Sequence, residues 1–285
     1  MEIAKNINKK KTYVGRHIVL ALVALFWLIP IIWLVVTSFS DYDGMNTSHF
    51  FPEVWSARHY VQLFHSDTVN QFSAWFLNTA KIAVCSCLIA TMFTLMVAYA
   101  TSMLRFKARK PLMNIAVILN LFPGMLSMIA VYFILKMFGL TNNHIGLVLI
   151  YSASSGLGYL IAKGFFDTVP KAVCEAAKID GASEAKICFQ IVLPMSKPII
   201  VYTVISAFLV PWMDFVFAKM ILNAGISSYY TVAIGLYAML EKSLINSYFT
   251  IFCCGGVIVS IPISILFFLM QKFYVEGITG GAVKG

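Results

Sequence analysis

The sequence predicts an all-α polytopic membrane protein with six transmembrane helices and both termini in the cytoplasm. Of its 285 residues, 60% are hydrophobic and only 12% are charged, and the mean hydropathy is +0.84. Apolar runs of about 20 residues, the length that spans a bilayer, recur along the chain. Basic residues gather in alternate connections between these runs, which indicates how the spans are oriented. This composition excludes a soluble protein.

The chain opens with a basic segment, residues 1–16, which we expect in the cytoplasm. An apolar run follows, and we predict a first transmembrane helix over 17–38, kinked at Pro30. No small-x-small cleavage site comes after it, so we predict an uncleaved span rather than a signal peptide. Residues 39–72, whose charged residues are mostly acidic, form a predicted polar extracytoplasmic loop.

The rest of the chain, 73–274, is the predicted membrane core, with a cytoplasmic loop at 167–198 and a cytoplasmic tail at 275–285. Polar residues, together with glycine and proline, interrupt the third and fourth apolar runs. The predicted second to sixth spans cover about 76–104, 112–137, 145–162, 199–222 and 248–269.

The positive-inside rule fixes the orientation. With the N-terminus, the 105–110 loop, the 163–197 region and the tail in the cytoplasm, that side holds 16 of the 21 basic residues. The six cysteines lie in spans or in the cytoplasmic loop and lack zinc-type spacing, so we expect reduced packing residues.

Residues 171–198 are the longest polar, helix-prone stretch of the chain. Val173, Ala176, Ala177 and Asp180 share one stripe at helical spacing, so a short first helix should present a face of mostly small residues. Gly181 permits a left-handed turn. Ser183 can cap a second helix, which Pro194 should end. We therefore expect two short helices with a sharp bend at the membrane surface, suited to close docking against another protein.

This stretch resembles the EAA loop of ABC-importer permeases. The resemblance rests on Glu175-Ala176-Ala177, on Asp180-Gly181-Ala182-Ser183, and on Ile191-Val192-Leu193-Pro194. It implies the type I ABC-importer permease fold and a coupling helix that docks in a cleft of an ATP-hydrolysing subunit. The residues that it assigns to ATPase coupling are Glu175, Ala176, Ala177, Asp180, Gly181, Ala182, Leu193 and Pro194.

From about residue 70 to its end the chain is similar to permeases of maltose-type carbohydrate importers, and most to their shorter subunit. The ending Gly277-Ile-Thr-Gly-Gly-Ala-Val-Lys-Gly285 carries part of this likeness. It implies that a flexible tail contacts the ATPase subunits through Thr279, Gly281 and Lys284. A frayed terminus is the alternative reading of the same composition.

Span five holds Asp214, the only acidic residue deep in a predicted span, two positions after Trp212. An ionisable group there is costly and marks a functional hypothesis. An aromatic ring beside a carboxylate suits a sugar, so both residues are candidates for a substrate pathway. The alternative is an Asp at a subunit interface or gate, with Trp212 as ordinary packing.

The resemblance implies a non-catalytic subunit of an oligosaccharide importer in a bacterial cytoplasmic membrane, with a maltodextrin-like sugar as the first expectation. The implied partners are a second homologous permease, an ATP-binding subunit dimer, an extracytoplasmic sugar-binding protein and membrane lipid, but no nucleic acid. We expect no metal or cofactor on this chain, because ATP and Mg belong to the partner ATPase.

Other functions stay open. The cargo could be another oligosaccharide or a polyol phosphate. A secondary transporter should show repeated halves and paired ionisable residues within its spans, whereas Asp214 stands alone. A membrane-embedded enzyme needs a catalytic constellation that the sequence does not show.

Overall fold

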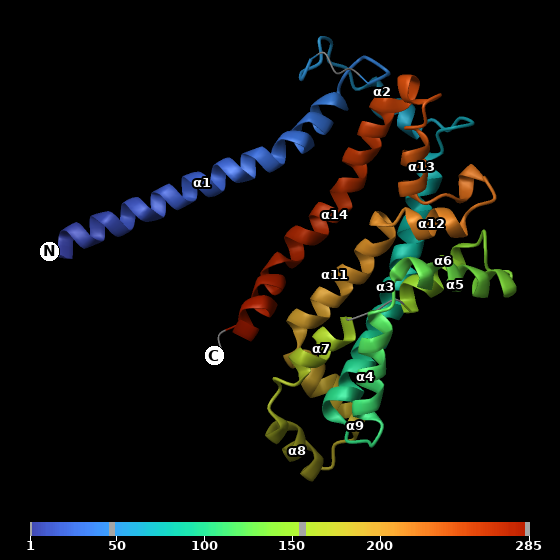
Figure 1. Cartoon of the computed structure of the whole chain (residues 1–285). Helices are drawn as coiled ribbons and strands as arrows, with labels where there is room; N and C mark the ends of the chain where they lie inside the picture. Colours follow the sequence, from blue (N-terminus) through green and yellow to red (C-terminus); the bar gives the residue numbers. More distant parts are fainter. Residues whose placement is uncertain (1, 46–48, 154–157, 283–285) are drawn as a thin grey trace. The chain divides into compact units, whose positions relative to one another are not determined.

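The computed structural model describes residues 2–45, 49–153 and 158–282, and the side chains of 15–45, 49–153 and 158–271 (Figure 1). Within these ranges the chain is helical and has no strand; one isolated bridge joins Ser40 to Trp55. The predicted all-α class is therefore confirmed. The chain divides into two compact units: unit 1 comprises Met1–Asn70 and Leu236–Val259, and unit 2 comprises Gln71–Gly235 and Ser260–Gly285.

Unit 1 joins the first helix of the chain to the start of the last. It contains α1 (Glu2–Thr37), α2 (Arg58–Phe64) and the beginning of α14 (Ile245–Ala282). The ring centroids of Trp33 and Phe249 lie 6.0 Å apart. The fully buried His59 places its ring nitrogens 3.0 Å from the Ser40 carbonyl oxygen and 2.8 Å from an Asp43 carboxylate oxygen. Local sequence patterns did not predict this pairing or α2.

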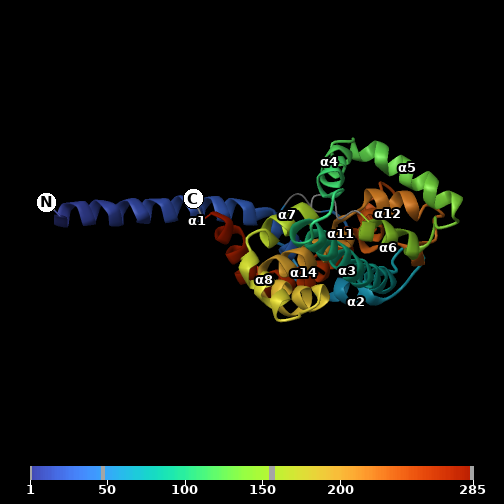
Figure 2. The ribbon, with the colours of Figure 1, turned by 90° about the horizontal axis from the view of Figure 1, so that it is seen from below.

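Unit 2 is built around α3 (Phe72–Met103), a 32-residue helix. It packs against α6, α7 and α11, as the view in Figure 2 shows. The other helices of the unit are α4 (Arg109–Asn120), α5 (Gly124–Met137), α6 (His144–Ala153), α7 (Gly158–Phe166), α8 (Lys171–Ile179), α9 (Glu184–Ile187), a π turn (Cys188–Val192), α10 (Leu193–Met195), α11 (Lys197–Met213), α12 (Val216–Ile221) and a 3₁₀ turn (Ser227–Tyr229). Helix α13 (Val232–Ala238) crosses the boundary between the units.

The N-terminal end of α3 is fixed to the 227–235 segment. The Trp75 indole N–H donates to the Ser227 carbonyl at 2.8 Å, and the Asn78 amide donates to the Ser228 carbonyl at 2.8 Å. A Cβ on Gly235 would overlap the Trp75 ring, so only glycine permits this approach.

Two predicted spans are bent pairs of helices. Helices α4 and α5 meet at 101° beside Pro123, where the sequence predicted an interruption, and α6 and α7 differ in direction by 42°. Figure 2 shows α4 standing apart from the packed helices of the unit, whereas α5 contacts α12 and buries Leu135 in an apolar cluster with Ile221.

The fifth predicted span, expected as one run to residue 222, is wrong in its second half. Helix α11 ends at Met213 and α12 begins at Val216. Pro211 has no backbone N–H, so one helical hydrogen bond is missing near the end of α11. The Asp214 side chain accepts two backbone N–H groups of the next helix. The break therefore depends on Asp214, which the periodicity had placed inside a helix.

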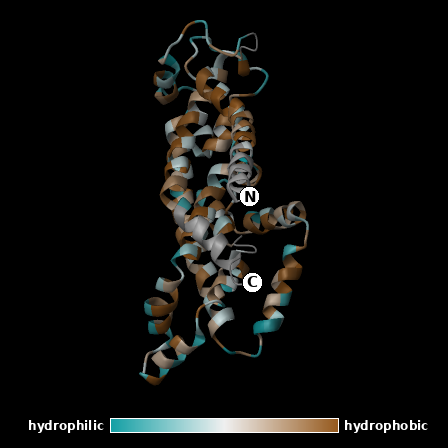
Figure 3. Ribbon diagram, turned by 90° about the vertical axis from the view of Figure 1, so that its left-hand side faces the viewer, coloured by the Kyte–Doolittle hydropathy of each residue, from teal (hydrophilic) through white to brown (hydrophobic). Residues whose placement is uncertain are grey.

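Three described helices are long and apolar enough to cross a membrane, within 15–37, 72–103 and 245–271. Counting each bent pair as one span raises the number to as many as six. Figure 3 shows hydrophobic residues along the helices and hydrophilic ones in connecting loops. Many large apolar side chains are exposed, as expected of helices that meet lipid or other subunits.

Candidate functional site

The bend of the EAA-like loop is a Schellman motif. Helix α8 ends at Ile179, and Gly181 has φ +81, in the left-handed region. The Gly181 N–H donates to the Lys178 carbonyl at 3.0 Å, and the Ala182 N–H donates to the Ala177 carbonyl at 2.9 Å. The glycine turn predicted from the sequence is confirmed.

The second helical segment begins as predicted but does not end as predicted. Ser183 caps α9, its hydroxyl accepting the Lys186 N–H at 3.3 Å. The helical run continues through the π turn and past Pro194 to Met195, and α11 then leaves at 85°. A π turn shifts backbone hydrogen bonds by one residue, so it can accommodate a proline that has no N–H to donate.

Polar contacts fix the loop to the C-terminal end of α3. Lys178 forms an ion pair with Glu184, and the Tyr99 hydroxyl donates to the Glu184 carboxylate at 3.2 Å. The hydrogen bond from Lys178 lowers the pKa of the Glu184 carboxyl. Beneath these contacts lies an apolar cluster that includes Phe166, Ile187 and Val192.

A second contact joins α3 to the start of the loop. Ser102 donates to Asp167 at 2.6 Å, and Lys163 forms an ion pair with the same carboxylate. Burial raises the pKa of Asp167, but the hydrogen bonds from Lys163 and Ser102 outweigh it and lower the pKa.

The exposed face of the loop differs from the predicted face at Ala177. Glu175, Ala176, Asp180 and Gly181 are exposed, whereas Ala177 is half-buried. Ala177 is drawn inward because its carbonyl accepts the Ala182 N–H and both residues pack on the cluster beneath. Ala182 and Leu193 are likewise half-buried, and Pro194 is exposed.

Two exposed apolar side chains at this face were not predicted. Ile179 is 87% exposed and Phe189 is 69% exposed. Ile179 adjoins the Asp180-Gly181 turn and lies three residues after the exposed Ala176, just outside the predicted stripe. Helix α8 buries Cys174 instead, and Cys188 is half-buried.

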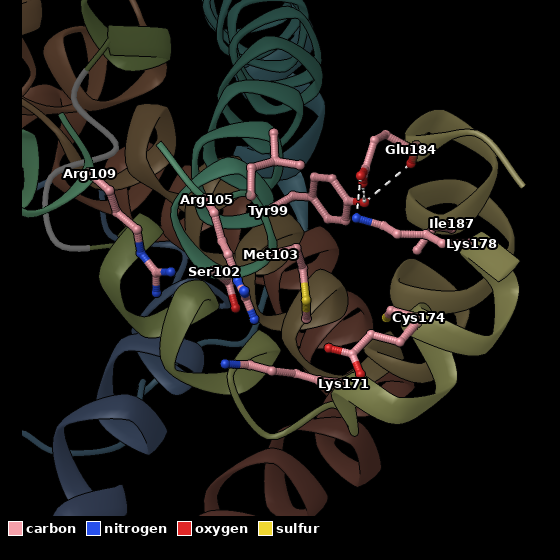
Figure 4. Close-up of a pocket in the computed structure, with 12 residues that line it drawn as sticks. Tyr99, Ser102, Met103, Arg105, Arg109, Lys171, Cys174, Lys178, Glu184 and Ile187 are labelled. Atoms are coloured by element: carbon pink, nitrogen blue, oxygen red, sulfur yellow. Dashed lines mark hydrogen bonds and ion pairs between the residues drawn. The ribbon is translucent and has the colours of Figure 1, made fainter. Parts of the chain in front are cut away.

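A cavity of about 330 Å³ lies between the end of α3 and the loop. Figure 4 shows Tyr99, Lys178 and Glu184 joined at one side and Arg105 and Arg109 at the other. Glu175 also lines the cavity, and no described ion pair occupies its carboxylate. Among the described residues, Glu175 and Asp180 are exposed carboxylates of the loop without an ion pair, and they lie beside a small-residue turn with exposed apolar neighbours.

The second candidate pair, Trp212 and Asp214, is separated by the end of α11. Trp212 is 5% exposed, and its ring packs on Phe76 and Phe208. Asp214 accepts the Tyr151 hydroxyl at 2.6 Å and the N–H groups of Phe217 and Ala218 at 3.2 and 3.0 Å.

Tyr151 also lines a cavity of about 300 Å³ between α3, α6, α7 and α11, together with Thr94, Tyr202, Thr203 and Ser206. Asp214 is not among its lining residues, so the carboxylate reaches this cavity through Tyr151. The hydroxyl-bearing residues are scattered over three helices, and no local pattern could have grouped them.

The predicted tail residues fall at the end of α14. Thr279 and Gly281 lie within the helix, which extends to Ala282, and Lys284 is outside the described residues. The expected flexible, glycine-rich segment from 277 onward is therefore wrong for the described part. A helix already formed can extend through these glycines, since each costs only about 1 kcal/mol and no new nucleus is needed.

Comparison with known proteins identifies the family. Residues 90–280 match the family described as "Binding-protein-dependent transport system inner membrane component". The chain belongs to this family. As an inner membrane component, this permease has the membrane location that its composition predicted.

The permease is similar to two curated sugar permeases of Bacillus subtilis (strain 168). It is 32% identical over 270 residues to the galactooligosaccharides transport system permease protein GanQ, covering 94% of each chain. It is 30% identical over 286 residues to the maltodextrin transport system permease protein MdxG, covering 99% of this chain and 98% of MdxG. The predicted resemblance to maltose-type carbohydrate permeases is confirmed.

Among solved structures, the permease resembles a chain of a bacterial ABC transporter involved in the import of the acidic polysaccharide alginate. The TM-score is 0.77 at 22% identity, with 92% of this chain and 95% of that chain covered. This likeness supports the type I importer permease fold.

Proposed function

We propose that this permease is the non-catalytic transmembrane subunit of an ATP-driven, binding-protein-dependent oligosaccharide importer. The observation that carries the proposal is the exposed loop at 171–195. Its glycine turn, its small residues and Glu175, which has no ion pair among the described residues, form a compact projection that we call the knob. In this proposal the knob docks in a cleft of an ATP-binding subunit, and ATP and Mg are bound there rather than on this chain.

The loop transmits force because it is anchored as well as exposed. Two polar contacts and an apolar cluster join it to α3, so movement of the knob is passed to the helices of unit 2. A second permease, a pair of ATP-binding subunits and an extracytoplasmic sugar-binding protein complete the proposed assembly.

The proposed cargo is an oligosaccharide that passes at the interface with the second permease. Maltodextrins, the cargo expected from the sequence resemblance, are tested first. Galactooligosaccharides are tested beside them, because the relatives named for the two cargoes are of similar identity. The hydroxyl-lined cavity beside Tyr151 is the proposed part of the pathway on this chain, and Asp214 orients Tyr151 from behind.

Substitution of Glu175 tests the coupling role. Glu175→Lys should abolish uptake and substrate-stimulated ATP hydrolysis by the reconstituted complex, because a cation would meet the basic partner groups that the carboxylate is proposed to pair with. Glu241→Lys makes the same change in charge on an exposed acid outside the loop, and should leave both activities unchanged. Wild-type uptake by Glu175→Lys would refute the assignment.

A further inference from the structure

A groove lined by five cations lies beside the EAA-like loop and is not used by the proposed coupling mechanism. Its volume is about 780 Å³, within the range of small-ligand sites. The cations are Arg105, Lys107, Arg109, Lys110 and Lys163, and no acidic residue lines the groove.

The cations are not neutralised within the described structure, with one exception. Lys163 forms an ion pair with Asp167, and its side chain is only 13% exposed. Arg105, Lys107 and Lys110 are exposed and Arg109 is half-buried, and none of these four has an ion pair among the described residues. Arg109 also interacts with Asp167, since its charge helps to lower the pKa of that carboxyl. Arg105, Lys107 and Lys110 are thus three exposed, mutually repelling cations without an ion pair among the described residues.

The local backbone adds to this positive potential. Arg109 and Lys110 form the first turn of α4, which has no acidic residue there, and Ala108 gives no side-chain cap. Cations at a helix N-terminus oppose the helix dipole, whereas an anion there would be stabilised. A negatively charged ligand would thus relieve two unfavourable interactions at once.

The groove also has an apolar side. Phe106 and Met113 line it, and α4 continues from it with Leu112, Ile115 and Ile118 each more than half exposed. A ligand with an anionic head and hydrocarbon chains fits this arrangement, because its chains can lie along the exposed face of α4. We propose that the groove binds the phosphate headgroup of an anionic membrane phospholipid.

The experiment uses the assembled complex in nanodiscs of equal parts phosphatidylglycerol and phosphatidylcholine, with retained lipid measured by native mass spectrometry. The wild type should retain phosphatidylglycerol selectively. Lys107→Gln/Lys110→Gln should weaken that retention roughly tenfold to thirtyfold, since each basic residue near an anionic lipid contributes about 1 kcal/mol. Lys136→Gln/Lys242→Gln removes two exposed cations elsewhere and should keep wild-type retention.

Three results would overturn the proposal. One is equal retention of the two lipids by the wild type, which needs no variant, and another is unchanged selectivity in the Lys107→Gln/Lys110→Gln protein. The third is displacement of phosphatidylglycerol by millimolar inorganic phosphate, with equal phosphate binding in pure phosphatidylcholine, which would assign a soluble anion.

The same variant separates the lipid from an acidic protein partner. If Lys107→Gln/Lys110→Gln lost its ATP-binding subunit in pure phosphatidylcholine while the control kept it, the groove would be a protein interface and the lipid assignment would fail. Retention of that subunit by both variants is the expected result. Because the readout is bound lipid, the test is independent of whether Glu175 couples transport.

Discussion

At the scale of single residues, Asp214 shows how one side chain can define a break in a membrane helix. It accepts two backbone N–H groups of α12 and the hydroxyl of the buried Tyr151. A carboxylate with three donors is stabilised locally, which offsets the cost of placing it among apolar helices. This arrangement favours a structural contribution from Asp214, with Tyr151 as the group nearer to any solute.

Substitution of Asp214 should show whether its carboxylate stabilises the helix break or contacts the transported solute. Asp214→Ala removes the cap, worth about 1 kcal/mol, and leaves the Tyr151 hydroxyl unsatisfied, at about 1–3 kcal/mol. We expect a lower midpoint of thermal unfolding in detergent, with a smaller loss in Asp214→Asn, which keeps an acceptor oxygen. An Asp214→Ala protein of wild-type stability that fails to transport would instead place the carboxylate on the substrate.

The sequence singled out Asp214 because a lone charge stands out in an apolar span, and Glu175 because it begins the EAA-like motif. It did not single out Tyr151, Tyr99 or Ser102, whose importance depends on partners more than 60 residues away. Hydroxyl groups are common in membrane helices, so only the tertiary structure distinguishes those that hold a carboxylate.

At the scale of elements, the turn between α8 and α9 was predictable because its determinants are local. A glycine at the left-handed position and a serine three residues before a backbone N–H act within one turn of helix. The continuation past Pro194 and the break after Met213 were not predictable in this way. The first depends on a π turn, in which backbone hydrogen bonds shift by one residue. The second depends on backbone N–H groups that donate to the Asp214 side chain.

Alanine substitutions at two glycines test the turn. Gly181→Ala should destabilise the loop by about 1–2 kcal/mol, because the residue has φ +81, where a Cβ is strained although nothing crowds it. Gly164→Ala is the matched change, in α7 with equally open space, and should be neutral or slightly stabilising. Amide hydrogen exchange of residues 176–187 should be faster in Gly181→Ala than in the wild type and unchanged in Gly164→Ala. Equal exchange rates in the two variants would contradict the role of the turn.

At the scale of the whole molecule, the number of spans and their orientation rest on the charge pattern and stay predictions. They can be checked in intact cells with a membrane-impermeant thiol reagent. Cysteine at Lys242, on the predicted outer side, should be labelled, whereas cysteine at Lys107 should be labelled only after the cells are opened. Labelling of Lys107→Cys from outside would reverse the topology.

The grouping of residues 236–259 with the first 70 residues could not be read from hydropathy, since apolar runs do not state their neighbours. It follows from specific pairs, such as the Cys254 thiol, which donates to the Ser38 carbonyl at 3.2 Å.

Helix α3 has a mechanical consequence. Its 32 residues include no glycine or proline, so it has no built-in hinge, and it is attached near both ends: Trp75 and Asn78 at one, Tyr99 and Ser102 at the other. At 1.5 Å per residue it is about 48 Å long, so a tilt of about 10° about one end would carry the other by about 8 Å. Movement of the 171–195 loop would thus be transmitted along α3 to the 227–235 segment with little lost to bending.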